Sequence, residues 1–483
     1  MPLDDRDRAE LFCSQVDAWD SHESLFSDLR VRYDDESATV SGLRRRRRRV
    51  ANAGDEPIKT VSLIERNGVL LWCDDIPDWQ ESIPEGLPKL DIGPRRRRLR
   101  RRAGLPLPHR AETPPEMKDG PLVLTRTFPV LDPNKITAAV GRIDQRLNPA
   151  LEDSLRSRLR SLRREPDGTF TLGGDASGSF VGRTLLFVHG TFSNAKNMLA
   201  EFTATQEGLR FLNVALGGEK PYDNVVFFEH ATLAVSPVIN ALELGRFFAN
   251  ASGQIDVIAH SRGGLVVRWW LEAFGKSLSV VPATPVRAVL AGSPLNGTSL
   301  AAPDKVKDAL NLLSNIGSFM EATLNLVGPA NPFIWVAGKL VQVVVSVTGA
   351  LGKTPLIDGV VALIPGLSGQ SMVSNNMEVD RLRLGPCVID PRYYAVQSNF
   401  QTTDPGWKFW QYFRKANMAD IATNAIFPGH NDLVVDTQSM IDFGVPRLQL
   451  AAPPRDFGTG ERVWHCNYFR QRETIDYITQ NLA

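Results

Sequence analysis

Residues 254–268 read QIDVIAHSRGGLVVR, a strand pattern that runs directly into a helix pattern. The apolar run from Ile255 to Ile258 is typical of a buried strand, and apolar residues at helical spacing begin at Leu265. Between them, Ala-His-Ser-Arg-Gly is a variant of the G-x-S-x-G turn, which holds a serine hydroxyl above the carboxyl edge of a parallel sheet. We therefore predict that Ser261 is a nucleophile. A serine beside glycines also occurs in ordinary turns, so the prediction depends on the remaining sequence.

Composition describes an ordinary globular chain. Of the 483 residues, 43% are hydrophobic and 23% charged, and the net charge of +1 provides no overall field that would attract nucleic acid. The four cysteines contain no C-x-x-C pair, which argues against a disulfide framework or a zinc site. The mixed, acidic N-terminus predicts no secretory signal peptide. We expect a cytoplasmic protein that needs no cofactor or metal.

Strand and helix patterns alternate on both sides of the serine turn. Strand patterns occupy 183–188, 224–228, 286–291 and 392–400, and helix patterns occupy 194–212, 237–248 and 473–482. This alternation predicts an α/β fold with a mostly parallel sheet and helices on both faces.

The first of these strands runs into His-Gly-Thr-Phe at residues 189–192. A loop at this position can donate a backbone N–H to an oxyanion, and the residue after the nucleophile can donate another. We expect these donors to be Thr191 or Phe192, together with Arg262. The alternative is a simple glycine turn with His189 packed inside.

Three motifs in order resemble the lipase and lipid-deacylase branch of the α/β-hydrolases. They are His-Gly-Thr-Phe at 189–192, Ala-His-Ser-Arg-Gly-Gly at 259–264 and Gly-Ser-Pro-Leu-Asn-Gly-Thr at 292–298. The last is similar to a G-T-P-x-x-G-T loop of that branch. The resemblance covers roughly residues 180–483 and implies an α/β-hydrolase fold with a Ser-Asp-His triad in that chain order.

The resemblance also suggests the acid and the base. Asn-Asp-x-x-Val, after a Tyr-Tyr strand, is similar to the segment where bacterial lipases carry the acid. Asp432 is therefore the expected acid, with Asp436 and Asp404 as alternatives. His465 lies on a loop before the last helix pattern, where this fold keeps its base, and His430 is the alternative.

Residues 303–372 interrupt the α/β pattern with apolar helical spacing and a nearly continuous apolar stretch at 333–351. The stretch has the length of a transmembrane span, but Lys339 lies inside it and would cost roughly 3 kcal/mol at the bilayer centre. Plain core helices are a second interpretation. The third, which we favour, is an inserted lid over an acyl pocket.

Residues 1–175 lack the alternation of strand and helix patterns that follows them. They predict a separate accessory module of β-rich or α+β type, and the hydrolase domain is expected at 176–483. Short strand patterns occur at 38–40, 59–64 and 68–72. Residues 134–164 are basic and have helical spacing, which predicts one or two bridging helices.

Two arginine runs, 44–49 and 95–102, stand out in this module. They could bind an anionic lipid headgroup or form a charge-balanced, solvated surface. Aromatic residues are not interleaved with the arginines as stacking on bases would require, so a nucleic-acid partner is not favoured.

Together these patterns predict a serine hydrolase of carboxylic esters, with a lipid acyl ester as substrate and an acyl-enzyme intermediate. Peripheral membrane contact through the lid or the arginine runs would fit this activity. Two alternatives remain open. One is a non-catalytic membrane- or partner-binding module, and the other is an acyltransferase that uses the same triad.

Overall fold

The computed structural model describes part of the chain, in several segments. The described residues are 60–66, 69–73, 122–129, 136–176, 178–274, 286–302, 309–316, 340, 364–372, 376–384, 391–402, 426–427, 429–445 and 448–482. Both arginine runs, the strand pattern at 38–40, Asp404 and most of the expected lid lie outside the described residues. None of the described helices is long and apolar enough to cross a membrane.

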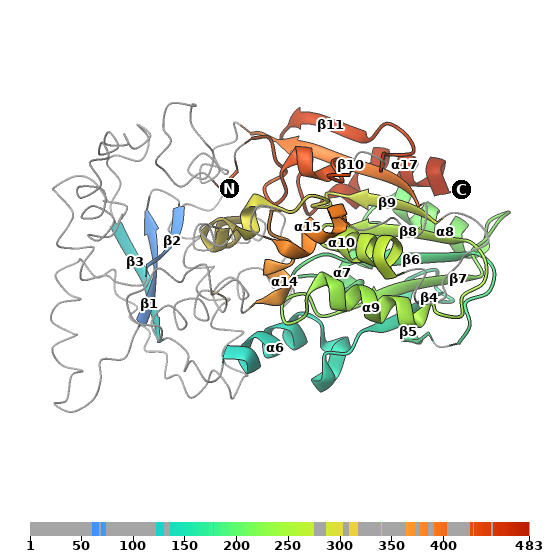
Figure 1. Ribbon diagram of the computed structural model, residues 1–483, viewed down its shortest axis with the longest axis horizontal. Helices are drawn as coiled ribbons and strands as arrows, with labels where there is room; N and C mark the ends of the chain where they lie inside the picture. Colours follow the sequence, from blue (N-terminus) through green and yellow to red (C-terminus); the bar gives the residue numbers. More distant parts are fainter. Residues whose placement is uncertain are drawn as a thin grey trace. The chain divides into compact units, whose positions relative to one another are not determined.

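The chain divides into two compact units. One comprises 1–136, 307–356 and 404–426, and the other comprises 137–306, 357–403 and 427–483. The second unit contains an eight-stranded sheet (Figure 1). In spatial order its strands are β11 (Arg455–Gly460), β10 (Arg392–Phe400), β9 (Arg287–Ala291), β8 (Ile255–His260), β6 (Thr184–Val188), β7 (Asn224–Glu229), β4 (Arg158–Arg164) and β5 (Phe170–Asp175).

The strands from β11 to β7 pair in parallel, and β4 runs antiparallel to both β7 and β5. The central strands are apolar along their length because both faces of the sheet are covered. In β6, Leu186 and Val188 belong to one buried cluster, whereas Leu185 and Phe187 belong to the cluster on the other face. The prediction of a mostly parallel sheet between two helical layers is therefore confirmed.

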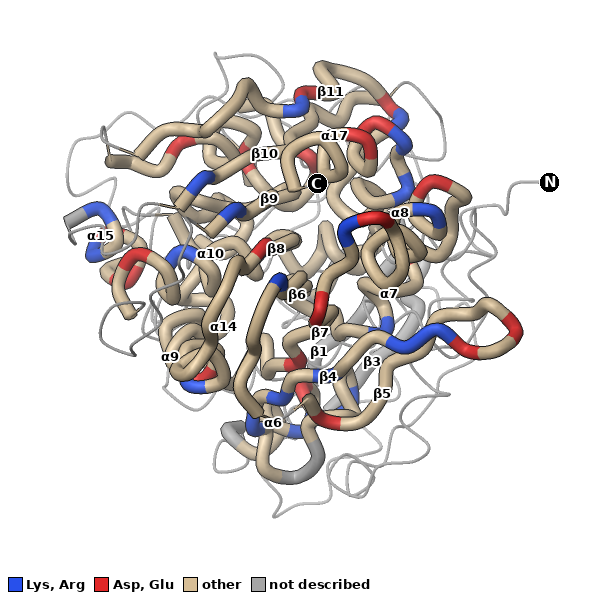
Figure 2. The backbone as a smooth tube through the Cα atoms, turned by 90° about the vertical axis from the view of Figure 1, so that its right-hand side faces the viewer, with Lys and Arg blue, Asp and Glu red and all other residues tan. Residues whose placement is uncertain are grey.

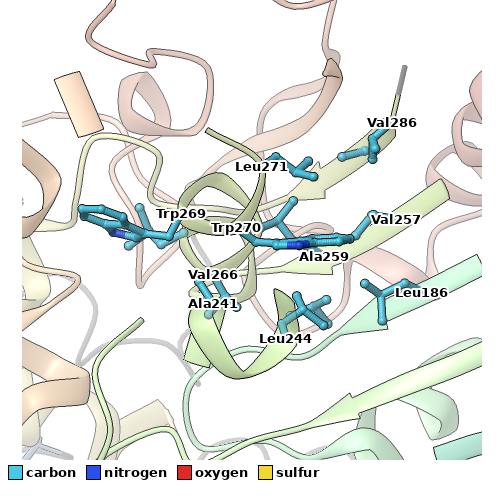
Figure 3. Close-up of a cluster of buried hydrophobic side chains, with 14 of the residues drawn as sticks. Leu186, Ala241, Leu244, Val257, Ala259, Val266, Trp269, Trp270, Leu271 and Val286 are labelled. Atoms are coloured by element: carbon cyan, nitrogen blue, oxygen red, sulfur yellow. The ribbon is translucent and has the colours of Figure 1, made fainter. Parts of the chain in front are cut away.

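Helices cover both faces of this sheet, as Figure 2 shows for α9 and α10 on one side and α7 and α8 on the other. The first cluster includes residues of α9 (Pro237–Phe247), α10 (Gly263–Arg268), the π-helical turn η4 (Trp269–Phe274) and α15 (Met377–Leu384). The second includes residues of α7 (Ala195–Thr203), α8 (Gln206–Gly217) and α17 (Arg472–Leu482). Figure 3 shows Trp270, which is fully buried, within the first cluster.

The single helix expected over 194–212 is two helices. Asn194 caps α7 by accepting the N–H of Asn197, and Thr205 caps α8 by accepting the N–H of Gly208. The second cap ends the first helix and starts the next, because a threonine oxygen at this position replaces the missing intrahelical partner.

The basic segment at 134–164 is only partly helical. It contains α6 (Ile136–Leu147) and the 3₁₀ turn η3 (Pro149–Ser154), but its end forms β4. Pairing with β7 and β5 overrides the local helical preference of this arginine-rich segment. The eight-stranded sheet therefore starts at residue 158, before the boundary expected at 175/176.

The first unit contains a three-stranded antiparallel sheet of order β2-β1-β3. Its strands are β1 (Thr60–Arg66), β2 (Val69–Cys73) and β3 (Leu122–Pro129). The strands expected at 59–64 and 68–72 are thus confirmed, and β3 was not predicted.

The outer edge of β2 contacts residues 309–316, which are helical and come from the expected lid. Asn315 accepts the Leu70 N–H through Oδ1 at 3.0 Å and donates to the Leu70 carbonyl through Nδ2 at 2.9 Å. Asn311 accepts the Trp72 N–H at 2.8 Å, and the Trp72 indole donates to Ser314 Oγ at 3.0 Å. These side chains satisfy an edge strand that would otherwise present unpaired backbone groups.

We expect Asn315→Ala to lower the free energy of local opening of β2 by about 2–4 kcal/mol, because two buried backbone groups of Leu70 lose their partners. Hydrogen exchange of the segment 69–73 measures this. Asn311→Ala is the matched control, since it frees only the Trp72 N–H and should have about half the effect. Equal exchange in wild type and Asn315→Ala would show that the contact does not stabilise the strand.

Candidate active site

Ser261 lies at the turn between β8 and α10, with its side chain almost fully buried. Its φ is 54°, in the left-handed region that costs energy for a non-glycine residue. The Ser261 N–H donates to the Ala291 carbonyl at 2.9 Å, and the Gly264 N–H donates to the Ser261 carbonyl at 2.9 Å. The strained turn is therefore held at both its strand side and its helix side.

Two glycines make room for this turn. A Cβ on Gly263 would lie 2.5 Å from the Val188 carbonyl oxygen, so only glycine lets α10 approach β6. A Cβ on Gly190 would lie 2.6 Å from Ser261 Cβ and 3.2 Å from its Oγ. The loop after β6 thus passes directly over the serine.

Asp432 and His465 form a buried pair. His465 Nδ1 donates to Asp432 Oδ2 at 2.8 Å, and in the neutral ring this tautomer has Nε2 as the accepting nitrogen. Tyr468 donates its hydroxyl to the same carboxylate oxygen at 2.9 Å. The other oxygen, Oδ1, accepts the N–H groups of Val434 at 3.1 Å and Val435 at 2.8 Å. Four donors therefore fix the orientation of the carboxylate.

The His465 imidazole lies beside the serine turn. His260, the residue before Ser261, donates from Nε2 to the His465 carbonyl at 2.7 Å, and the two rings are 4.8 Å apart. A Cβ on Gly292 would lie 3.3 Å from His465 Nδ1 and 3.2 Å from Asp432 Oδ2, so the end of β9 contacts the pair. The Ser261 hydroxyl and the His465 ring are not hydrogen-bonded in the described structure, and such bonds often tighten only when substrate binds.

The expected oxyanion donors differ in their surroundings. Phe192 has a φ of 58°, and its N–H already donates to the Thr232 hydroxyl at 3.3 Å. The backbone N–H groups of Thr191 and Arg262 have no hydrogen-bond partner within the described part of the chain. The geometry thus favours Thr191 over Phe192 as the partner of Arg262.

The Arg262 guanidinium is fully buried and holds the loop after β7. Nη2 donates to the Val235 carbonyl at 2.6 Å and to Asn240 Oδ1 at 2.8 Å. Burial lowers the pKa of Arg262 to about 10, and the charges of Asp144 and Glu378 oppose this shift. The side chain is therefore still cationic at neutral pH.

The alternative candidates lie elsewhere or have other partners. Asp436 accepts the N–H of Ser299 at 2.9 Å and its hydroxyl at 3.1 Å. His430 is exposed. Sequence reasoning missed Tyr468 and His260, whose contacts are with residues distant in sequence and leave no local signal.

Two buried histidines, His189 and His230, and the half-buried His260 surround the site. Burial lowers the pKa of His189 to about 4 and of His260 to about 3, and it lowers the pKa of His230 well below its usual value. The His189 and His230 rings stack at 4.0 Å, and His230 Nε2 has no partner among the described residues. These rings are neutral at physiological pH.

We expect stability to fall as the pH drops from about 6.5 toward 4. The unfolded chain takes up protons on these histidines below about 6.5, whereas the folded chain does not, so each costs up to ~1.4 kcal/mol per pH unit. Asp144 and Glu229 act in the opposite sense as the pH falls through their raised pKa values. In His230→Phe, the free energy of unfolding should fall less steeply with decreasing pH, by the contribution of one histidine. Urea unfolding measured from pH 7.5 to 5 gives this slope. An unchanged slope would contradict the assignment of His230 as a buried neutral ring.

The strand order, the two helical layers and the serine on the turn after β8 define an α/β-hydrolase fold. Residues 158–483, about two thirds of the chain, match a family described as a domain of unknown function, DUF7379, and the chain belongs to this family. A search of curated proteins finds no sequence match.

Three solved structures of similar fold illustrate the low level of sequence identity. The product of the gene lin2722 from Listeria innocua is 12% identical over 62% of this chain and 94% of its own, with a TM-score of 0.32. A thermophilic esterase from Thermogutta terrifontis is 12% identical over 67% and 97%, with a TM-score of 0.28. Lipase 1 from Pelosinus fermentans is 14% identical over 59% and 94%, with a TM-score of 0.32. The strand order of the sheet defines the fold independently of these similarities.

Proposed function

We propose that this protein is a serine hydrolase of carboxylic esters, with Ser261 as nucleophile, His465 as base and Asp432 as acid. The observation that carries the proposal is the buried Asp432–His465 hydrogen bond beside a serine in a strained turn. A histidine whose Nε2 can accept a proton, beside a serine hydroxyl, suits acyl transfer.

In this mechanism, Ser261 Oγ attacks the ester carbonyl as its proton passes to His465 Nε2. Asp432 holds the ring in the tautomer that accepts this proton and stabilises the imidazolium that forms. The N–H groups of Thr191 and Arg262 stabilise the oxyanion. His465 then protonates the leaving alcohol. In the second half of the reaction, His465 takes a proton from the attacking water and returns it to Ser261 Oγ as the acid is released.

The proposed substrates are lipid acyl esters. The proposal is supported by the apolar insertion at 303–372 and by the three motifs similar to those of lipases and lipid deacylases. A lid at an acyl pocket would also bring the protein into contact with a lipid surface. An acyltransferase would use the same residues with an alcohol in place of water.

The test is a panel of acyl esters of short, medium and long chains, assayed with and without a detergent interface. We expect turnover to rise with chain length and with the interface, and free acid to be the product. Preference for short soluble esters would remove the lipid part of the proposal. Release of an acylated alcohol in place of free acid would favour the acyltransferase. If the protein hydrolyses none of the esters but binds vesicles of anionic lipid, a non-catalytic module would be favoured.

A further inference from the structure

The segment from α6 to η3 contacts the loops after β6 and β7. Three consecutive contact points lie at Asp144, Leu147 and Asn148, which the i, i+3, i+4 spacing brings to one side of the helix end. This segment precedes residue 158, where the family match begins.

Asp144 clamps the loop after β7. Its carboxylate is 1% exposed and accepts three successive backbone N–H groups, from Thr232 at 2.8 Å, Leu233 at 3.0 Å and Ala234 at 2.6 Å. It also accepts the Thr232 hydroxyl at 3.2 Å. A single side chain therefore fixes the conformation of a whole turn.

That turn in turn holds the two residues beside the proposed oxyanion site. The Thr232 hydroxyl, oriented by Asp144, accepts the N–H of Phe192 at 3.3 Å. The carbonyl of Val235 accepts Arg262 Nη2 at 2.6 Å. Phe192 follows Thr191 directly, and the Phe192 N–H lies in the peptide plane that joins the two residues. The bond to Thr232 fixes this plane and thereby restricts the backbone that carries the Thr191 N–H.

The other two contact points fix the far end of the loop after β6. Asn194, which caps α7, donates Nδ2 to the Leu147 carbonyl at 2.7 Å. Asn148 donates Nδ2 to Glu229 Oε2 at 2.6 Å, and the same oxygen accepts the Ala195 N–H at 3.1 Å. The loop 190–194 is thus held at Phe192 and again at Asn194 by one segment.

We propose that Asp144 is a positioning residue for the oxyanion site, acting through the Thr232 hydroxyl on the loop that carries Thr191. This inference rests on the proposed function. It assigns to the segment before the matched domain a part in catalysis, because without Asp144 the Thr232 hydroxyl is free to rotate away from the Phe192 amide.

The experiment compares full-length variants by kcat, KM and the rate of labelling with a fluorophosphonate. Thr232→Val removes the hydroxyl with little change in shape, Thr232→Ser retains it, and Asp144→Asn places amide hydrogens against backbone N–H groups. The control is Asp256→Asn, another buried carboxylate. Asp256 accepts Arg287 at 2.7 Å and Tyr222 at 2.9 Å near the start of β8, the opposite end of the strand from Ser261.

We expect Thr232→Val and Asp144→Asn to lower kcat and the labelling rate by about 10- to 100-fold, with KM within about twofold of wild type, since a misplaced donor weakens only the transition state. Thr232→Ser should recover most of kcat. Asp256→Asn should lower the melting temperature and leave the kcat of the folded protein unchanged. If Asp144 had a purely structural role, Asp144→Asn would behave like Asp256→Asn. Its melting temperature would fall, and the kcat of the folded protein would stay at the wild-type value.

The outcomes separate the two proposals. If Ser261→Ala is inactive while Thr232→Val and Asp144→Asn keep wild-type kcat, the positioning role is wrong and the serine hydrolase stands. If Asp144→Asn does not fold, Thr232→Val alone decides the question. If Ser261→Ala is as active as wild type, the proposed function fails and the positioning role fails with it.

Discussion

Ser261→Ala is expected to reduce kcat for ester hydrolysis by about 10⁵- to 10⁶-fold, because the enzyme loses the atom that forms the acyl intermediate. The fold should be retained, since the Ser261 side chain has no hydrogen bond to another residue within the described structure. The turn is held by the Ser261 backbone, through the Ala291 carbonyl and the Gly264 N–H, and alanine keeps both bonds. Near-ultraviolet circular dichroism and the melting temperature check the fold.

Ser293→Ala is the matched control for this variant. Ser293 is a fully buried serine just beyond β9, and the hydrogen bond that its hydroxyl makes among the described residues is to the Ala291 carbonyl, at 3.5 Å. We expect its activity to stay near that of wild type. Activity of Ser261→Ala equal to wild type would exclude Ser261 as the nucleophile.

Asp432→Asn is expected to lower kcat by about 10⁴-fold with the fold intact, because an asparagine cannot hold the required tautomer of His465. In the wild type both carboxylate oxygens accept hydrogen bonds, from His465 and Tyr468 on one side and from Val434 and Val435 on the other. An amide group presents hydrogens to one of these pairs. With the amide NH₂ facing His465, the favoured tautomer carries its proton on Nε2 and accepts at Nδ1. A protonated Nε2 cannot accept the serine proton.

Asp436→Asn is the control for this second variant. Asp436 is also buried in the same loop, but it accepts from the Ser299 backbone and hydroxyl and does not contact His465. Its loss should affect stability far more than kcat. If Asp436→Asn lowered kcat as strongly as Asp432→Asn, the assignment of the acid would be wrong.

The parallel strands and the serine turn could be predicted from sequence because they depend on local composition. A strand covered on both faces is apolar throughout, as β6 and β8 are, and the glycines at 190 and 263 are required by close approach to the serine turn. The resemblance to lipases selected Asp432 and His465 as candidates, and the structure places Asp432 Oδ2 2.8 Å from His465 Nδ1.

The parts that were missed depend on partners distant in sequence. β4 carries Arg158, Arg160 and two further arginines, and only its pairing with β7 makes it a strand. In the sequence, Asp144 is a single acidic residue in a basic helical segment. The three N–H groups that donate to it lie about ninety residues away in the chain. Tyr468 likewise has no motif of its own, because its role comes from contact with Asp432, which lies 36 residues away in the chain.

The central claim is that Ser261 is the nucleophile activated by His465, and mapping the site of fluorophosphonate labelling tests it most directly. Attack by Ser261 Oγ forms an oxygen–phosphorus bond, releases fluoride and passes the serine proton to His465. We expect mass spectrometry of the digested protein to find one adduct, on the peptide that contains Ser261, and its formation to be about 10³-fold slower or more in His465→Ala. An unlabelled Ser261, or an adduct on a different residue, would contradict this account.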